Sequence, residues 1–116
     1  RKESCMNITS ELHLAANVFS ITGDLASDQV DQFKRTIKES LCESPSDVIL
    51  DCAGLDHIDS AGLEALLWLT DELTQQGYKL RLACVNKSVI RAFEITRLER
   101  VFSTNETVEA AARSFG

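Results

Sequence analysis

Leu55-Asp-His-Ile-Asp-Ser-Ala-Gly-Leu63 is the stretch around which the rest of this chain is organised. An apolar run over residues 48–53 precedes it and predicts a buried strand, and an amphipathic pattern over about 60–76 follows it and predicts a helix. Ser60 is predicted to be the N-cap of this helix, because a serine hydroxyl can accept a hydrogen bond from an N–H of the first turn. The Ser60 hydroxyl would then be exposed where outward-pointing N–H groups favour negative charge, including a phosphate.

Three segments in order carry a family resemblance. Asp59-Ser-Ala-Gly-Leu63 follows a predicted strand, and Val18-Phe-Ser-Ile-Thr-Gly-Asp-Leu25 ends in a Gly-acidic-Leu sequence. The later half contributes the segments 84–93 and 95–102. With these segments in this order and spacing, the chain resembles the STAS domain family of the anti-sigma factor antagonist type.

The resemblance implies a function. In that family the Ser or Thr directly after this Asp takes phosphate from a partner kinase, and Ser60 is at the matching position. It implies a cytoplasmic regulatory module, not an enzyme, that binds an anti-sigma factor with serine kinase activity when unphosphorylated and is released by phosphorylation at Ser60. Many relatives have an Asp after the Gly-acidic-Leu turn, where this chain has Ala26 followed by Ser27 and Asp28. The alternative is a STAS subunit or domain of a membrane transport complex, either a lipid ABC transporter or an anion transporter.

A partner-binding surface is expected around the start and the outer face of the central helix. Trp68 falls opposite the predicted core stripe, on the side of Glu72. It is either covered by a neighbouring helix or an apolar anchor at an interface, and we expect it to be at least partly exposed. The predicted core stripe is Leu63, Leu66, Leu67, Thr70 and Leu73. The predicted partner-binding residues are Asp24, Asp59, Ser60, Ala61, Glu64 and Trp68.

Catalytic alternatives are weaker. A hydrolase elbow needs Gly two residues before its Ser, and Ile58 occupies that place. Asp56 and His57 suggest a triad with Ser60, but neighbours on one loop rarely align in that way. A receiver domain would use Asp51, but Asp24 lacks the adjacent acidic residue that such domains need.

Metal and cofactor binding are not predicted. Cys52, Asp56, His57 and Asp59 are close in sequence, but the only other histidine is His13, and the spacing fits no zinc pattern. No Gly-rich phosphate loop is present. We therefore expect no catalytic residues, no metal and no cofactor.

Composition sets broader bounds. With 116 residues and 44% hydrophobic content, one domain over 1–116 is expected, with residues 1–10 poorly ordered. The net charge of −6 argues against nucleic acid and against direct binding to anionic membranes. No apolar run approaches the ~20 residues that a membrane span needs, and no signal-peptide pattern opens the chain. The chain starts at Arg1, which also fits an excised fragment.

The four cysteines indicate a reducing compartment. Cys5, Cys42, Cys52 and Cys84 form no Cys-x-x-Cys pair, and Cys52 and Cys84 lie in apolar strand contexts. A reduced, cytoplasmic protein is expected.

Alternating strands and helices predict an α/β fold. We expect a STAS-like, mixed but mostly parallel sheet of four or five strands, with about four helices packed mainly on one side. Residues 48–50 should lie in a central strand, with Asp51 and Asp59 flanking a loop at one end of the sheet. The predicted strands cover residues 5–9, 11–15, 18–22, 48–53, 79–85 and 101–102, with a turn at Ala16-Asn17 and a strand end at Gly23-Asp24. The predicted helices are 27–42 capped by Ser27, 60–76 closed by Gly77, a short helix from Asn86 to about Thr96, and one starting at Thr104 or Asn105.

Overall fold

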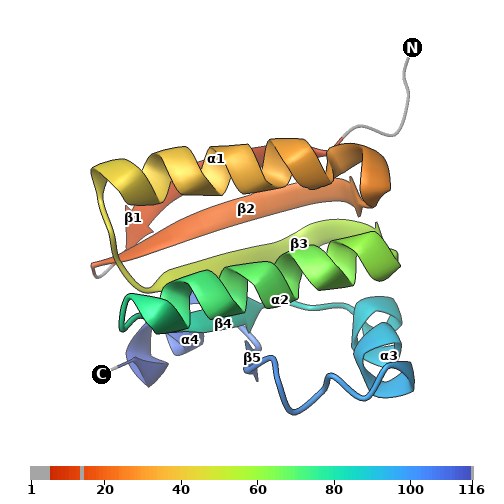
Figure 1. The fold of residues 1–116 in the computed structure, drawn as a ribbon. Coiled ribbons are helices and arrows are strands. Elements are labelled where there is room, and N and C mark those ends of the chain that lie inside the picture. The colour runs from red at the N-terminus through yellow and green to blue at the C-terminus, as the bar shows by residue number, and fades with distance from the viewer. Residues whose placement is uncertain (1–5, 14, 116) are drawn as a thin grey trace.

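The computed structural model describes residues 6–13 and 15–115 of the chain. Its sheet has five strands in the order β1-β2-β3-β4-β5 (Figure 1). The first pair is antiparallel and each later pair is parallel. The strands are β1 Asn7–His13, β2 Ala16–Leu25, β3 Val48–Ile58, β4 Leu80–Ala83 and β5 Thr104–Asn105.

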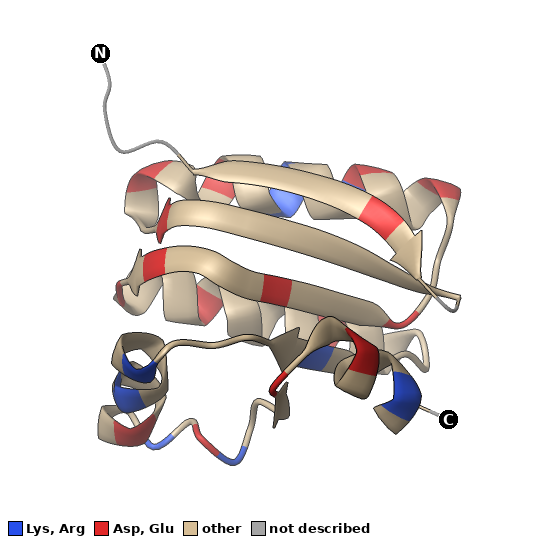
Figure 2. Ribbon diagram, turned by 180° about the vertical axis from the view of Figure 1, so that it is seen from behind, with Lys and Arg blue, Asp and Glu red and all other residues tan. Residues whose placement is uncertain are grey.

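The helices pack on the faces and at one end of this sheet. Figure 1 shows α1 and α2 side by side on one face, α3 beyond one end of the sheet, and α4 on the opposite face, where Figure 2 shows it in front. The main core lies under α1 and α2 and includes Phe19, Phe33 and Leu69. A smaller core of Val18, Ile49 and alanines lies under α4. The helices are α1 Val30–Glu43, α2 Ser60–Gln75, α3 Lys87–Ile95 and α4 Val108–Ser114, and a 3-10 turn η1 Ser27–Gln29 precedes α1.

Several expectations about the fold are confirmed. Residues 48–50 are fully buried in β3, the third of five strands. Gly77 has φ +86° and closes α2, because its N–H donates to Thr74 O and the next N–H donates to Leu73 O. Asn86 caps α3, since its side chain accepts a hydrogen bond from Val89 N.

The central strand is longer than predicted. β3 continues to Ile58, because its second half pairs in parallel with the end of β2, Asp24 opposite His57. Asp51 is therefore inside the strand, and the prediction that Asp51 and Asp59 flank a loop is wrong. Gly23-Asp24 does not end β2 either: the strand runs to Leu25, with register shifts that include one between these two residues.

Other boundaries also move. A single strand, β1 Asn7–His13, takes the place of the two predicted strands 5–9 and 11–15, so residues 7–10 belong to one strand. Cys5 and Leu14 lie outside the described residues. Ala16-Asn17 belongs to β2 and not to a turn. Residues 101–102 are not a strand, because the last strand of the sheet is β5. The last helix, α4, is capped by Thr107, whose side chain accepts a hydrogen bond from Ala110 N. Ser27 begins the turn η1 and does not cap a helix.

Candidate functional site

The start of α2 is fixed by Asp59. Its backbone is extended, with φ −107° and ψ −174°, and its Oδ1 accepts a hydrogen bond from Gly62 N at 2.9 Å. Ser60 is the first residue of the helix, so the prediction that Ser60 is the N-cap is wrong. Both residue types can cap a helix. Here the extended backbone of β3 continues through Asp59, because Asp59 N donates to Leu25 O, and the helix therefore starts at Ser60.

The second carboxylate oxygen of Asp59 has a structural partner as well. Asp59 Oδ2 accepts from Ser27 N at 3.2 Å, which joins the start of α2 to the turn after β2. The carboxylate that the sequence suggested for partner binding thus holds two elements together.

Gly62 allows α2 to approach β2 closely. A Cβ at this position would lie 2.2 Å from Leu25 O and 2.7 Å from Ile58 Cγ1. Real Cβ atoms do not approach a carbonyl oxygen so closely, so the first turn of α2 can lie here only with glycine. Sequence reasoning missed this role, although a glycine inside a helical pattern is itself a signal of close packing.

Ser60 is exposed, and its hydroxyl makes no hydrogen bond to any of the described residues. Because Asp59 provides the cap, nothing in the local structure requires the Ser60 hydroxyl. The backbone N–H groups of Ser60 and Ala61 lie in the first turn of α2, where N–H groups have no acceptor within the helix. The serine is therefore chemically available at the positive end of a helix dipole.

His57 pairs with Asp24 across the β2–β3 ladder. His57 Nδ1 lies 3.3 Å from Asp24 Oδ1, and the two side chains are 77% and 31% exposed. The structure does not assemble a triad of Asp56, His57 and Ser60, because the partner of His57 is Asp24 of β2. Asp24 is thus placed beside the end of β3 and near the start of α2.

The outer face of α2 carries Ser60, Glu64, Trp68 and Glu72 at four-residue spacing, which places them on one stripe. Trp68 is half-buried, and the ammonium groups of Lys34 and Lys38 of α1 lie 5.3 and 5.9 Å from its ring centroid. Trp68 is thus partly covered by α1 and partly exposed.

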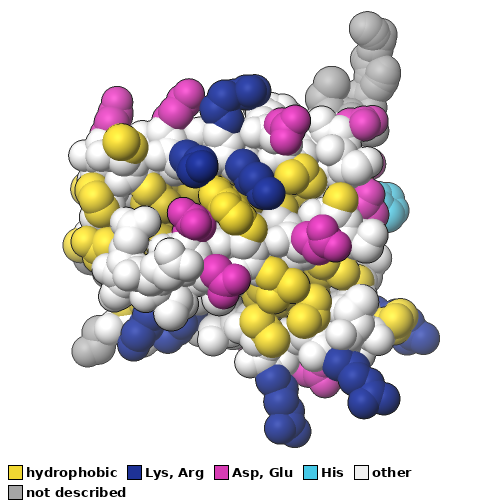
Figure 3. All heavy atoms as spheres, viewed as in Figure 1, with side chains coloured by type: hydrophobic (Ala, Val, Ile, Leu, Met, Phe, Trp, Pro, Cys, Tyr) yellow, Lys and Arg dark blue, Asp and Glu magenta, His cyan; other side chains and the backbone are white. Residues whose placement is uncertain are grey.

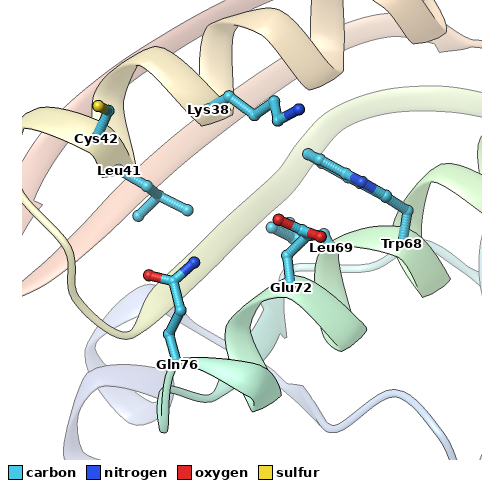
Figure 4. Close-up of a pocket in the computed structure, with 7 residues that line it drawn as sticks. All are labelled: Lys38, Leu41, Cys42, Trp68, Leu69, Glu72 and Gln76. Atoms are coloured by element: carbon cyan, nitrogen blue, oxygen red, sulfur yellow. The ribbon is translucent and has the colours of Figure 1, made fainter.

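A groove of about 330 Å³ follows Trp68 between α1 and α2. Figure 4 shows Lys38 and Leu41 reaching toward it from α1, and Trp68 and Glu72 from α2. Its lining residues are Lys38, Leu41, Cys42, Trp68, Leu69, Glu72 and Gln76.

The buried face of α2 differs in part from the predicted stripe. Leu63, Leu66 and Leu73 are buried as expected, whereas Leu67 and Thr70 are only half-buried. Ala65 and Leu69 are buried instead.

Three described cysteines are free thiols. Cys52 is buried in the core, and burial, with smaller contributions from Asp51 and Cys84, raises its pKa to about 12. The pKa of Cys84 is also raised, first by burial and then by the nearby Asp51 carboxylate. Cys42 is exposed at the groove.

Within residues 6–13 and 15–115, no three His, Cys, Asp or Glu side chains are grouped closely enough to hold a metal ion. In the same part of the chain, none of the helices has the length and apolar character needed to cross a membrane.

The STAS domain model matches residues 7–111, so this chain belongs to the STAS domain family. Among curated proteins it is 30% identical over 95 residues to BtrV of Bordetella bronchiseptica, which is named as an anti-sigma factor antagonist, and the match covers 82% of each chain. The predicted family is thereby confirmed.

Solved structures confirm the predicted fold. An anti-sigma factor antagonist from Thermotoga maritima matches with a TM-score of 0.86 at 18% identity, covering 92% of both chains. The anti-sigma factor antagonist SpoIIAA in its unphosphorylated form matches with a TM-score of 0.78 at 20% identity, covering 95% of this chain and 97% of that one. The phosphorylated form of SpoIIAA from Bacillus gives a TM-score of 0.70 at 19% identity, covering 93% and 99% of the two chains.

Proposed function

We propose that this chain is a cytoplasmic anti-sigma factor antagonist that regulates transcription by switching partners. When unphosphorylated it binds an anti-sigma factor with serine kinase activity, which frees a sigma factor. Phosphorylation at Ser60 releases that partner. In this proposal the chain is a binding module without catalytic residues, metal or cofactor.

The observation that carries the proposal is the free Ser60 hydroxyl. It is exposed at the first position of α2, and the capping role that would have occupied it belongs to Asp59. A kinase can therefore modify Ser60 without breaking a hydrogen bond on which the described structure depends. The curated relative named as an anti-sigma factor antagonist, matched over 82% of both chains, supports the choice of partner.

The partner surface in this proposal runs from Asp24 and Ser60 along the outer stripe of α2 to Trp68. Ser60, Glu64 and Trp68 follow one another at helical spacing. An aromatic side chain at the far end of the stripe is the residue type that commonly anchors an interface. The partner would therefore cover Ser60 together with Trp68, and Asp59 would act mainly by holding the helix start in place.

A STAS subunit of a membrane transport complex remains the alternative. Fold similarity does not separate the two functions, because one fold supports many. A pulldown from native lysate distinguishes them: a kinase-like anti-sigma factor supports the proposal, whereas a permease with its ATPase would replace it.

The phosphorylation site can be tested by intact mass. We expect wild-type protein incubated with the anti-sigma factor and ATP to gain one phosphate, and Ser60→Ala to gain none. Ser27→Ala is the matched control, because Ser27 is an exposed serine beside the same helix start. Equal phosphate incorporation in wild type and Ser60→Ala would remove Ser60 from the mechanism.

A further inference from the structure

The region of α3 and the turn after it exposes apolar side chains at the end of the sheet where α2 begins (Figure 1). Ile95 is 71% exposed and Val101 is 45% exposed, two of the three exposed large apolar residues in the described part of the chain. Figure 3, in the view of Figure 1, shows a group of hydrophobic side chains below α2 and beside α3, with Lys and Arg side chains projecting below them. Val89 and Phe93 are the buried residues that pack α3 against the core, so Ile95 does not contribute to that packing.

Charge in this region has the opposite sign to the rest of the chain. Residues 87–100 contain four of the 12 Lys and Arg residues but only two of the 18 Asp and Glu residues. Lys87, Arg91 and Ile95 recur at four-residue spacing along the exposed face of α3, and Figure 2 shows the basic residues on that helix. Arg97 and Arg100 follow in the turn and are exposed.

Arg97 is held in an unfavourable backbone conformation. Its φ is +62°, a left-handed conformation that is usually occupied by glycine. It ends α3, because Arg97 N donates to Glu94 O and Leu98 N donates to Phe93 O at 2.7 Å. An exposed arginine therefore occupies the position where glycine would stabilise the helix end, and backbone strain of this kind concentrates at functional sites.

We propose that Arg91, Ile95, Arg97, Arg100 and Val101 form a docking surface for an acidic, amphipathic segment of a partner protein. Carboxylates of that segment pair with the arginines, and its apolar side chains cover Ile95 and Val101. Charge complementarity selects this occupant, because the surface is basic within a chain of net charge −6.

The test uses a labelled amphipathic peptide of Glu, Leu and Ala, about 14 residues long, and a counterpart in which Gln replaces each Glu. We expect the Glu peptide to bind at least about fivefold more tightly than the Gln peptide at low salt and to weaken as salt rises. Amide shifts of the ¹⁵N-labelled protein should change over residues 87–102 and not at Ser60. Changes centred elsewhere, or equal binding of the two peptides, would overturn the proposal.

Arg97→Gly separates docking from folding. Relief of the left-handed conformation should raise the thermal midpoint by about 4 °C, while peptide affinity falls severalfold. Arg35→Gln, which removes an exposed positive charge from α1 and keeps a residue of similar helix propensity, should change neither quantity. Unchanged affinity of Arg97→Gly contradicts the proposal. Concentration-dependent self-association that Arg97→Gly abolishes would instead identify a second copy of this chain as the occupant, and would equally contradict it.

Discussion

Asp59 fixes the position of Ser60, because its two carboxylate oxygens accept hydrogen bonds from Gly62 N and Ser27 N. We expect Asp59→Ala to lower the free energy of unfolding by about 1–2 kcal/mol, the usual cost of a lost N-cap. Ser60→Ala should change it by less than about 0.5 kcal/mol, as for an exposed residue without a structural partner. Urea unfolding measures both values. A larger loss for Ser60→Ala than for Asp59→Ala would show that the serine is the cap.

Gly62 determines how close α2 comes to β2. A Cβ there would lie 2.2 Å from Leu25 O, a backbone atom that cannot move aside cheaply. We expect Gly62→Ala to cost about 1–3 kcal/mol, as overpacking does, although alanine is the better helix former. Urea unfolding against Ser60→Ala as the control checks this, and an unchanged or increased stability would contradict the close approach.

Ionisation of the buried Cys52 thiol makes the free energy of unfolding depend on pH in the alkaline range. The pKa of Cys52 is raised from 9.0 to about 12 in the folded protein, chiefly by burial. The unfolded chain releases this proton at lower pH, so the contribution of Cys52 is fully present below about pH 9 and is lost as pH rises toward about 12. Wild type should therefore lose stability more steeply over this range than Cys52→Val. Parallel pH profiles of the two proteins would contradict the assignment.

Among the elements, α1 and α2 together determine the environment of Trp68. Trp68 is the single tryptophan of the chain and is half-buried beside Lys34 and Lys38. We expect acrylamide to quench its fluorescence in the free protein less than that of free tryptophan, and less again once the anti-sigma factor is bound. Full quenching that the partner leaves unchanged would place Trp68 outside the interface.

Helix ends could be predicted from the sequence where the capping residue lies within a few residues of the end. Asn86 and Gly77 were recognised because an N-cap side chain and a glycine with positive φ act within a few residues of the helix end. The strand–helix alternation likewise predicted the parallel sheet.

Features that depend on tertiary pairing could not be predicted in this way. The polar residues Asp56 and His57 resemble a loop, and they belong to β3 only because the bulged end of β2 pairs with them. Asp59 and Ser60 are adjacent and both suitable as caps, so the choice depends on the contacts of Asp59 with Leu25 and Ser27. The sequence thus predicts a candidate site around Asp59 and Ser60, while the structural roles of Asp59 and Gly62 required the structure.

At the scale of the whole molecule, a phosphate on Ser60 should act on binding and hardly on folding. It adds a charge of about −1.5 to −2 at neutral pH. The start of α2 favours that charge by about 0.3–1 kcal/mol, and the neighbouring Asp59 carboxylate opposes it by a similar amount. The folded state is thus nearly indifferent, whereas a bulky dianion in a packed interface blocks close approach. A loss of about 3 kcal/mol in binding already weakens affinity more than a hundredfold.

The most direct test measures the affinity of the anti-sigma factor for unphosphorylated and Ser60-phosphorylated protein by titration calorimetry, with Ser60→Asp alongside and the free energy of unfolding of each form measured in urea. We expect phosphorylation to weaken binding more than about a hundredfold while the free energy of unfolding changes by less than about 1 kcal/mol. Equal affinity of the two forms, or loss of affinity only through unfolding, would contradict the partner switch at Ser60.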